Sequence, residues 1–436
     1  MNKIFTVLLT VILLLPVIAG EQALSQSSEE IIREKSIPFE TPADLDPLLD
    51  EIDDQRLVLM GEASHGTSEF YIWRAELSKR LIEEKGYNFI AVEGDWPAMA
   101  RINEYVKHKE RAPESIDAAM AFIDRWPLWM WRNQEVKELL VWLHEYNKDL
   151  EPGERVGFYG IDLYAKRDAI RNVISFLEGY DRTLASRAER TYRCMTRYRD
   201  VREYLQMVSR SGESCSEEMQ RVLQMVRQSG AFKEGGWKAF DAEHNAILAV
   251  NAEEHYLGNL RGGAVSWNAR ATHFYVTAER LLEYYGDGSR GIIWAHNTHI
   301  GDARATDMAR QGSVNIGQLA RENLGREQVY AIGFGTYTGR VLAARQWEGR
   351  IEAMETPPGR NGSWEAMLEA TGKEQLYLLL KDEELAGALQ SPLPHRAIGV
   401  TYNPMQERAN YVNTVIPDRY DAFIFFRETG VLDVLD

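Results

Sequence analysis

Cysteine is nearly absent from this chain, which has two, Cys194 and Cys215, among 436 residues. Two cysteines are too few for a disulfide scaffold, and no histidine lies near either one to complete a zinc site. Both fall in a charged, helix-like segment. In an oxidising compartment they would be free to pair, and the turn-like "RSGESCSEE" could fold one helix back on the other. We predict a bridge, with two unrelated thiols as the alternative.

Dense positive charge is also missing. Acidic residues outnumber basic ones 66 to 50, the net charge is −16, and no block of lysine and arginine is present to follow a phosphate backbone. Nucleic acid is therefore not expected as a partner. The sequence has no internal repeat and no low-complexity linker. This favours closely packed lobes over independent domains.

A long apolar run occurs at the N-terminus. Lys3 precedes an apolar run from Ile4 to about Ala19, and polar chain follows, which is the layout of a secretory signal peptide. Small residues at Val17 and Ala19 permit cleavage, and no cysteine follows that could carry a lipid. We predict that residues 1–19 are a signal peptide and that the protein is periplasmic or secreted. An uncleaved membrane anchor is the alternative, although the run is slightly short for a spanning helix.

Strand-like and helix-like segments alternate along the chain, which indicates an α/β protein with a largely parallel central sheet flanked by helices. The candidate strands are short apolar runs, as expected for buried parallel strands. They are Arg56–Met60, Asn88–Val92, Arg155–Tyr159, Gly291–Ala295, Gln328–Ile332, Gln375–Leu380, Ala397–Thr401 and Ala422–Phe426.

Residues 165–285 contain amphipathic runs and no convincing strand. We interpret them as a helical insertion lobe that forms one wall of an active-site cleft. The lobe would separate a first α/β half, residues 40–164, from a second half, residues 286–436.

Side chains capable of chemistry follow four of the candidate strands. They are Glu62 and His65 in "GEASHGT", Glu93 and Asp95 after the second strand, Asp162 after the third, and His296 and His299 in "HNTH". Ligands of open α/β sheets bind at the carboxyl ends of the strands. Any one of these residues could be structural, and Asp95 fits an N-cap, but their convergence at one edge predicts a shared active site.

Three chemistries suit such a set. Ser64 lies on a strand-to-helix turn, as a serine nucleophile would, but the G-x-S-x-G elbow needs glycine where this chain has Glu62. A second possibility is a zinc site, for which His296, His299, His65 and Glu62 offer enough nitrogen and oxygen ligands.

The third possibility needs no metal. His65 would act as a general base on water, and Glu62 would orient its ring. Arg74 lies beside the apolar stripe of the following helix, near the cleft, and together with the histidine pair it would stabilise the oxyanion that forms.

Several motifs, in order, resemble those of the erythromycin esterase family: "GEASHGTSEFY", "AVEGDWP", "WMWRN", "GFYGIDLY", "SWNAR", "IIWAHNTHIGDAR", "IGFGTYTG" and "ERANYV". The resemblance spans about residues 45–430. It implies an α/β sheet with a helical lobe and metal-independent ester hydrolysis, an activity known for opening macrolide lactones and so for antibiotic resistance. By motif, His65 resembles the family's general base and Glu62 its acidic neighbour, with Arg74, Glu93, His296 and His299 lining the cleft. No cofactor is implied.

Four further residues are assigned to substrate binding: Asp162, Trp129, Trp131 and Arg270. The tryptophans of "RWPLWMWRN" could form an apolar wall for a bulky ligand, but core packing is preferred for at least two of Trp126, Trp129 and Trp131. The expected partner is a small-molecule ester or lactone. A haem- or small-ligand-binding exported protein without catalysis is the alternative from another class.

Overall fold

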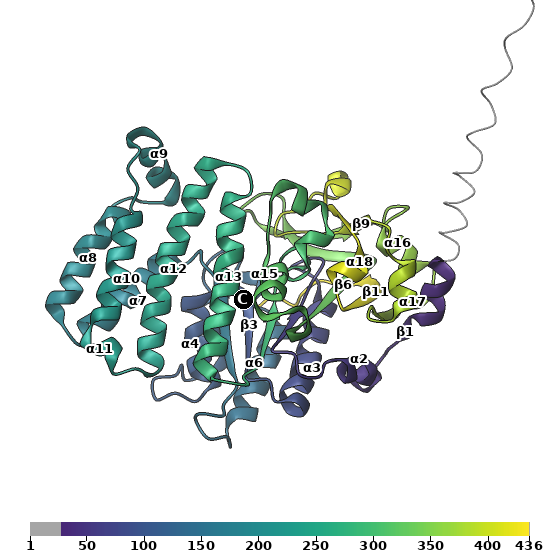
Figure 1. Cartoon of the computed structure of the whole chain (residues 1–436), viewed down its shortest axis with the longest axis horizontal. Helices are drawn as coiled ribbons and strands as arrows, with labels where there is room; N and C mark the ends of the chain where they lie inside the picture. The colour runs from purple at the N-terminus through teal and green to yellow at the C-terminus, as the bar shows by residue number, and fades with distance from the viewer. Residues whose placement is uncertain (1–27, 436) are drawn as a thin grey trace, which may run out of the picture.

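The structure, a computed structural model, describes residues 28–435, which form an α/β part and a lobe of helices beside it (Figure 1). The predicted signal peptide lies outside the described residues. Across residues 28–435, no helix is both long enough and apolar enough to cross a bilayer.

The α/β part is built on one sheet. Its strands are β1 (Ile37–Pro38), β2 (Leu57–Met60), β3 (Phe89–Asp95), β4 (Gly157–Asp162), β5 (Gly291–Trp294), β6 (Val329–Ala344), β7 (Ile351–Thr356), β8 (Gln375–Leu379) and β11 (Ala422–Thr429). The order is β1-β8-β11-β6-β2-β5-β3-β4, and β7 pairs with β6. The strands from β11 to β4 are parallel, whereas β1, β7 and β8 are antiparallel to their neighbours. The predicted, largely parallel α/β sheet is therefore confirmed.

Helices cover both faces of this sheet, which explains why the central parallel strands such as β2 are apolar. In β2, Val58 and Met60 pack into the core on one face, and Leu57 and Leu59 pack into the core on the other. The helices of this part are α2 (Asp46–Glu51), α3 (Ser68–Lys85), α4 (Trp96–Val106), α5 (Ile116–Met120), α6 (Gln134–Asn147), α14 (Asn297–Ile300), α15 (Ile316–Leu324), α16 (Trp364–Glu369), α17 (Glu383–Ala388) and α18 (Ile416–Arg419).

One predicted strand is wrong. Residues 397–401 form only isolated bridges, Ser64 with Ile398 and Ala344 with Thr401, while the neighbouring strand β9 (Leu393–Arg396) pairs with β10 (Tyr411–Thr414) in a separate small sheet. The segment runs from the turn after β2 to the end of β6 and meets each at a single residue. It therefore lies along no strand with which it could form a ladder. Strands β7 and β10 were not predicted, because they are partly exposed and lack an apolar run.

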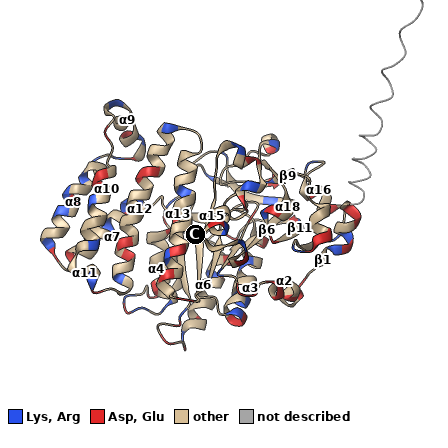
Figure 2. Cartoon of the chain, in the orientation of Figure 1, with Lys and Arg blue, Asp and Glu red and all other residues tan. Residues whose placement is uncertain are grey.

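The lobe beside the sheet consists of helices. They are α7 (Lys166–Glu178), α8 (Arg182–Thr196), α9 (Val201–Ser211), α10 (Ser216–Gln228), α11 (Gly230–Lys233), α12 (Gly236–Arg261) and α13 (Val265–Tyr285). The lobe has its own hydrophobic core, and α12 and α13 also pack on the sheet. Lysine, arginine and acidic residues are interspersed over both parts of the molecule (Figure 2).

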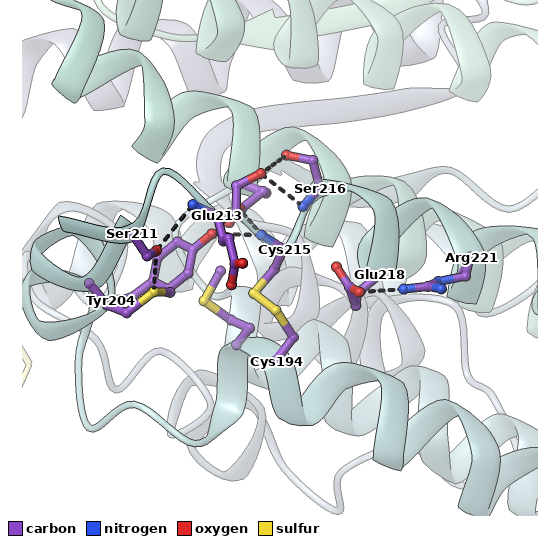
Figure 3. The surroundings of a disulfide bond; sticks show 12 residues. Cys194, Tyr204, Ser211, Glu213, Cys215, Ser216, Glu218 and Arg221 are labelled. Atoms are coloured by element: carbon purple, nitrogen blue, oxygen red, sulfur yellow. Dashed lines mark hydrogen bonds and ion pairs between the residues drawn. A yellow bond between two sulfur atoms is a disulfide. The ribbon is translucent and has the colours of Figure 1, made fainter. Parts of the chain in front are cut away.

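A disulfide between Cys194 and Cys215 joins the end of α8 to the start of α10, as predicted, with 5.8 Å between the two Cα atoms (Figure 3). Helix α9 lies inside the closed loop. The Tyr204 hydroxyl on α9 donates to Glu253 of α12 and accepts the backbone N–H of Cys215 at 2.9 Å. The bridge and this buried cluster together hold the outer helices on the lobe.

Replacing both cysteines with serine should lower the free energy of unfolding by about 3 kcal/mol, the chain-entropy value for a loop of about 20 residues. Urea denaturation followed by circular dichroism measures the change. Dithiothreitol should destabilise the wild type by a similar amount and leave the double variant unaffected. Equal free energies of unfolding for the wild type and the double variant without dithiothreitol would show that the bridge does not constrain the unfolded chain.

Candidate active site

A cavity of about 830 Å³ lies at the carboxyl edge of the parallel strands, with the helical lobe as one wall. Helices α7 and α13 contribute Asp168, Arg171, Trp267 and Arg270 to its lining. Of the residues predicted from the sequence, eight line the cavity: His65, Glu93, Asp95, Trp131, Asp162, Arg270, His296 and His299.

The turn after β2 is held by close backbone contacts. A side chain at Gly66 would meet the carbonyl oxygen of Leu342 at 2.0 Å, so only glycine fits there. The Gly66 carbonyl accepts the Leu342 N–H at 3.1 Å, and the Tyr71 hydroxyl donates to the His65 carbonyl at 3.1 Å. Ser64 is buried, bonds to the Thr67 hydroxyl and does not line the cavity. The turn therefore presents His65 rather than Ser64.

Hydrogen bonds link three side chains in the order His65, Glu62 and Arg74. The Nδ1 of His65 lies 2.7 Å from Glu62 Oε1, and Arg74 Nη2 donates to Glu62 Oε2 at 2.7 Å. A carboxylate only accepts hydrogen bonds, so Nδ1 carries the proton and Nε2 is the nitrogen with a free lone pair. Arg74 is fully buried, also donates to the Phe70 carbonyl at 3.2 Å, and does not line the cavity.

The prediction that Arg74 faces the cleft as an oxyanion donor therefore needs correction, because Glu62 lies between Arg74 and His65. Glu62 is likewise buried behind His65 and is not part of the cavity lining. Arg74 instead supplies the positive charge that keeps the Glu62 carboxylate paired.

Opposing effects set the pKa of His65. Burial lowers it, but the hydrogen bond and charge of Glu62, with a further contribution from Glu93, outweigh burial and raise the pKa above its ordinary value. The imidazole is thus a stronger base than a free histidine.

Arg270 is the centre of a second cluster in the cavity. It donates to Asp162 Oδ1 through Nε at 2.9 Å, to Glu93 Oε1 through Nη2 at 2.7 Å, and to His299 Nε2 through Nη1 at 3.0 Å. Burial would raise the pKa of Glu93, but positive charge, from His299 when protonated and from Arg270 always, holds it well below its ordinary value. Burial lowers the pKa of His299, and the Trp267 ring stacks on its imidazole with 4.5 Å between centroids.

His296 completes the arrangement beside His65, with 4.9 Å between the ring centroids. Its Nδ1 accepts the backbone N–H of Thr298 at 3.2 Å, so the neutral ring carries its proton on Nε2. That Nε2 is buried and makes no hydrogen bond of regular geometry in the part of the chain described, although the Ala63 carbonyl is close enough to the ring to raise its pKa. Burial, followed by the charge of His65, holds the pKa of His296 well below its ordinary value. The neutral ring therefore has an Nε2–H that can donate a hydrogen bond to a ligand.

Several residues lie elsewhere than predicted or were missed. Trp129 is buried in the core and does not line the cavity, and Trp131 is also in the core, which confirms core packing for two of the three tryptophans. Asp95 does not cap α4, because its carboxylate pairs with Arg125 and accepts the Ala165 N–H. Of the cavity residues not predicted, Trp267 lies within the "SWNAR" motif and could have been found there.

A guanidinium occupies the centre of the acidic cluster in the cavity. No group of three or more histidine, cysteine and acidic side chains suited to a metal ion occurs within residues 28–435. The guanidinium of Arg270 lies between Glu93, Asp162 and His299, where a bound cation would need its ligands.

Comparison with known proteins gives the following relationships. The family model described as erythromycin esterase matches residues 82–429. A putative hydrolase, YbfO, from Bacillus subtilis (strain 168) is 21% identical over 395 residues, 85% of this chain and 83% of the relative. An erythromycin esterase type II from Escherichia coli is 31% identical over 141 residues, 31% of each chain.

Solved structures share the fold at low sequence identity. A succinoglycan biosynthesis protein has a TM-score of 0.78 and 21% identity, covering 95% of this chain and all (100%) of its own. A Bacillus cereus protein has a TM-score of 0.79 and 17% identity, with 94% and 99% covered. A mutant erythromycin esterase in its open conformation has a TM-score of 0.59 and 17% identity, with 90% and 95% covered.

Proposed function

The chain belongs to the erythromycin esterase family and is a hydrolase of that type, and from this premise we propose that it cleaves a carboxylic ester or lactone by histidine-assisted attack of water, without a metal. The observation that carries the proposal is the pairing of two imidazoles at one cavity wall. His65 offers a free basic nitrogen, and His296 offers a free N–H donor.

The first step is proton transfer. Nε2 of His65 takes a proton from a water molecule while the water oxygen attacks the carbonyl carbon of the ester. Glu62 accepts the hydrogen bond from Nδ1–H of the imidazolium and stabilises its charge without taking the proton, much as the carboxylate does in a serine-protease triad. Arg74 keeps that carboxylate in place.

The attack places negative charge on the former carbonyl oxygen. The Nε2–H of His296 is suited to donate to this oxyanion, because the low pKa keeps the ring neutral with its proton on Nε2, and the residue lines the cavity. When the carbon–oxygen bond breaks, the protonated His65 returns the proton to the departing alcohol oxygen. The products are an acid and an alcohol, or one hydroxy acid from a lactone.

The direct test is a panel of esters, lactones and macrolides, followed by mass spectrometry for a gain of one water. At least one member should be converted, and chelator treatment should leave the rate unchanged, because no metal generates the nucleophile. Loss of activity with chelation and its return with Zn²⁺ would favour a metal-dependent hydrolase. A haem absorbance band together with no turnover would favour a binding protein.

The pH dependence should reflect the Glu62–His65 pair. The base must be neutral, so kcat/KM should rise with pH through the pKa of His65, at a midpoint above the ordinary histidine value of about 6.5. In Glu62→Gln the charge that raises this pKa is lost while burial remains, so the acid limb should move below about 6.5 and kcat should fall. A limb that does not move in Glu62→Gln would mean that another group titrates.

Export is also part of the proposal, and its support is the leader-like composition of residues 1–19. Intact-mass measurement of protein recovered from the periplasm or medium should give a chain that starts near Gly20. A species that retains Met1 in the membrane fraction would contradict it.

A further inference from the structure

An exposed tryptophan stands at the edge of the cavity, outside the catalytic cluster. Trp347 lies on the turn between β6 and β7, is 54% exposed, and lines the cavity. A large aromatic side chain that is half exposed and also lines a cavity is positioned to contact a bound ligand.

Trp347 is held in this position by a second segment of the chain. Trp126, from the connection between α5 and α6, meets it edge-on with 4.6 Å between ring centroids. The Trp126 indole N–H donates to the carbonyl of Gly349 at 3.2 Å, on the same turn. Trp126 itself does not line the cavity, so it supports Trp347 from behind. The exposed ring is thus fixed rather than free to collapse onto the protein.

Tyr164, the third aromatic group, faces the cavity from the start of the helical lobe, with 6.4 Å between its ring and that of Trp347. The guanidinium of Arg125 lies over the Tyr164 ring at 5.1 Å, and that of Arg270 lies at 5.2 Å. Aromatic rings attract cations, but these two groups already hold the cation–π positions at the Tyr164 ring. Each is also paired with carboxylates, Arg125 with Asp95 and Arg270 with Asp162 and Glu93, so the acidic groups here are already neutralised. A neutral ligand group fits this environment better.

The backbone at Gly399 and Val400 forms the part of the cavity wall next to these aromatic residues. Gly399 and Val400 line the cavity, and the Val400 carbonyl accepts the N–H of Ala344, three residues before Trp347, at 3.0 Å. A side chain built at Gly399 meets no atom within 4 Å, so open space lies in front of it. The wall can therefore accommodate a bulky group.

We propose that Trp347, Tyr164 and the backbone at Gly399 form a subsite for a neutral, bulky hydrocarbon group of the substrate, apart from the reacting carbonyl. This inference rests on the proposed ester hydrolysis for its role in catalysis, but the subsite can be tested by binding alone. The substrate class it selects is esters whose non-reacting part is apolar and ring-sized.

The binding test uses protein labelled with 5-fluorotryptophan, in which Trp347→Phe assigns the ¹⁹F signal of Trp347. Titration with cyclohexylmethanol should shift that signal in a saturable way. The matched cation, cyclohexylmethyltrimethylammonium, should bind more weakly. A Trp347 signal that does not respond, or tighter binding of the cation, would overturn the proposal.

The kinetic test compares cyclohexylmethyl acetate with methyl acetate, which share the reacting group. Trp347→Ala should lower kcat/KM for the larger ester about tenfold more than for the smaller one, through KM, since one aromatic contact is worth about that factor. Gly399→Leu, which fills the open space without a clash at its Cβ, should discriminate in the same direction. An equal effect on both esters would overturn the subsite.

Tyr180→Ala provides the matched control, because Tyr180 is 50% exposed but lies at the end of α7 and does not line the cavity. Tyr180→Ala should change neither the ratio of kcat/KM for the two esters nor the relative binding of cyclohexylmethanol and the cation. If the wild type hydrolyses neither acetate, the failure concerns the proposed ester hydrolysis, while the fluorine titration still decides the subsite.

Discussion

Replacing His65 with alanine should lower kcat by about 10²- to 10⁴-fold, the usual contribution of a positioned general base, with little change in fold. The reason is geometric, because the Nε2 of His65 is the basic nitrogen that the Glu62 hydrogen bond leaves free at the cavity. Removal of the ring leaves Glu62 still paired with Arg74, so no buried charge is orphaned. The measurement is kcat on an ester from the panel, with circular dichroism as the check on folding.

Ser64→Ala is the matched control within the same turn. The Ser64 hydroxyl bonds to Thr67 and does not reach the cavity lining, so its loss should cost little activity. An inactive Ser64→Ala protein would restore a serine nucleophile. Normal turnover by His65→Ala would move the active centre away from this turn altogether.

Replacing Arg270 with methionine should lower the free energy of unfolding by about 3–5 kcal/mol, the range for breaking a buried ion pair from one side. Glu93 and Asp162 would be left buried without their shared cation. Urea denaturation at neutral pH measures the loss. Turnover should also fall, because the same guanidinium positions His299.

The pH dependence of this loss has a defined sign. In the wild type the pKa values of Glu93 and Asp162 are depressed, so their stabilisation is present above the unfolded pKa and is lost as pH falls. In Arg270→Met both carboxylates lose the guanidinium that depresses their pKa values while burial remains, so both values should rise and the variant should recover stability relative to the wild type as pH falls. Arg340→Met, which breaks an exposed pair with Glu355, should cost less than about 1 kcal/mol at any pH. Equal losses in the two variants would contradict the buried-pair account.

Apolar runs and motif positions predicted the parts of this molecule that depend on local pattern. The run at Leu57–Met60 is a strand because both of its faces are covered, and the residues after it reach the cavity because parallel strands end at one edge. The segment 397–401 also contains apolar residues, but it forms only isolated bridges, and of its residues only Ile398 is buried. A short apolar run therefore does not by itself predict strand pairing.

The direction of a side chain was harder to predict than its neighbourhood. Helical periodicity placed Arg74 near the cleft, but its hydrogen bonds to Phe70 and Glu62 turn it behind the carboxylate. The contact of Trp126 with Trp347 joins segments more than 200 residues apart, 223 in the case of the bond to Gly349, and no local pattern indicates it. Such contacts depend on the assembled sheet.

The sheet order also limits how the chain can acquire its structure during synthesis. Strand β2, which leads into the turn that carries His65, has β5 on one side and β6 on the other, and both come more than 230 residues later in the chain, from Gly291 and Val329 onward. A nascent chain that ends before residue 291 holds β2 with both edges unpaired. The turn that carries His65 therefore forms late in folding, and the long-range pairing that creates it is of the kind that folds slowly and exposes strand edges until it is complete.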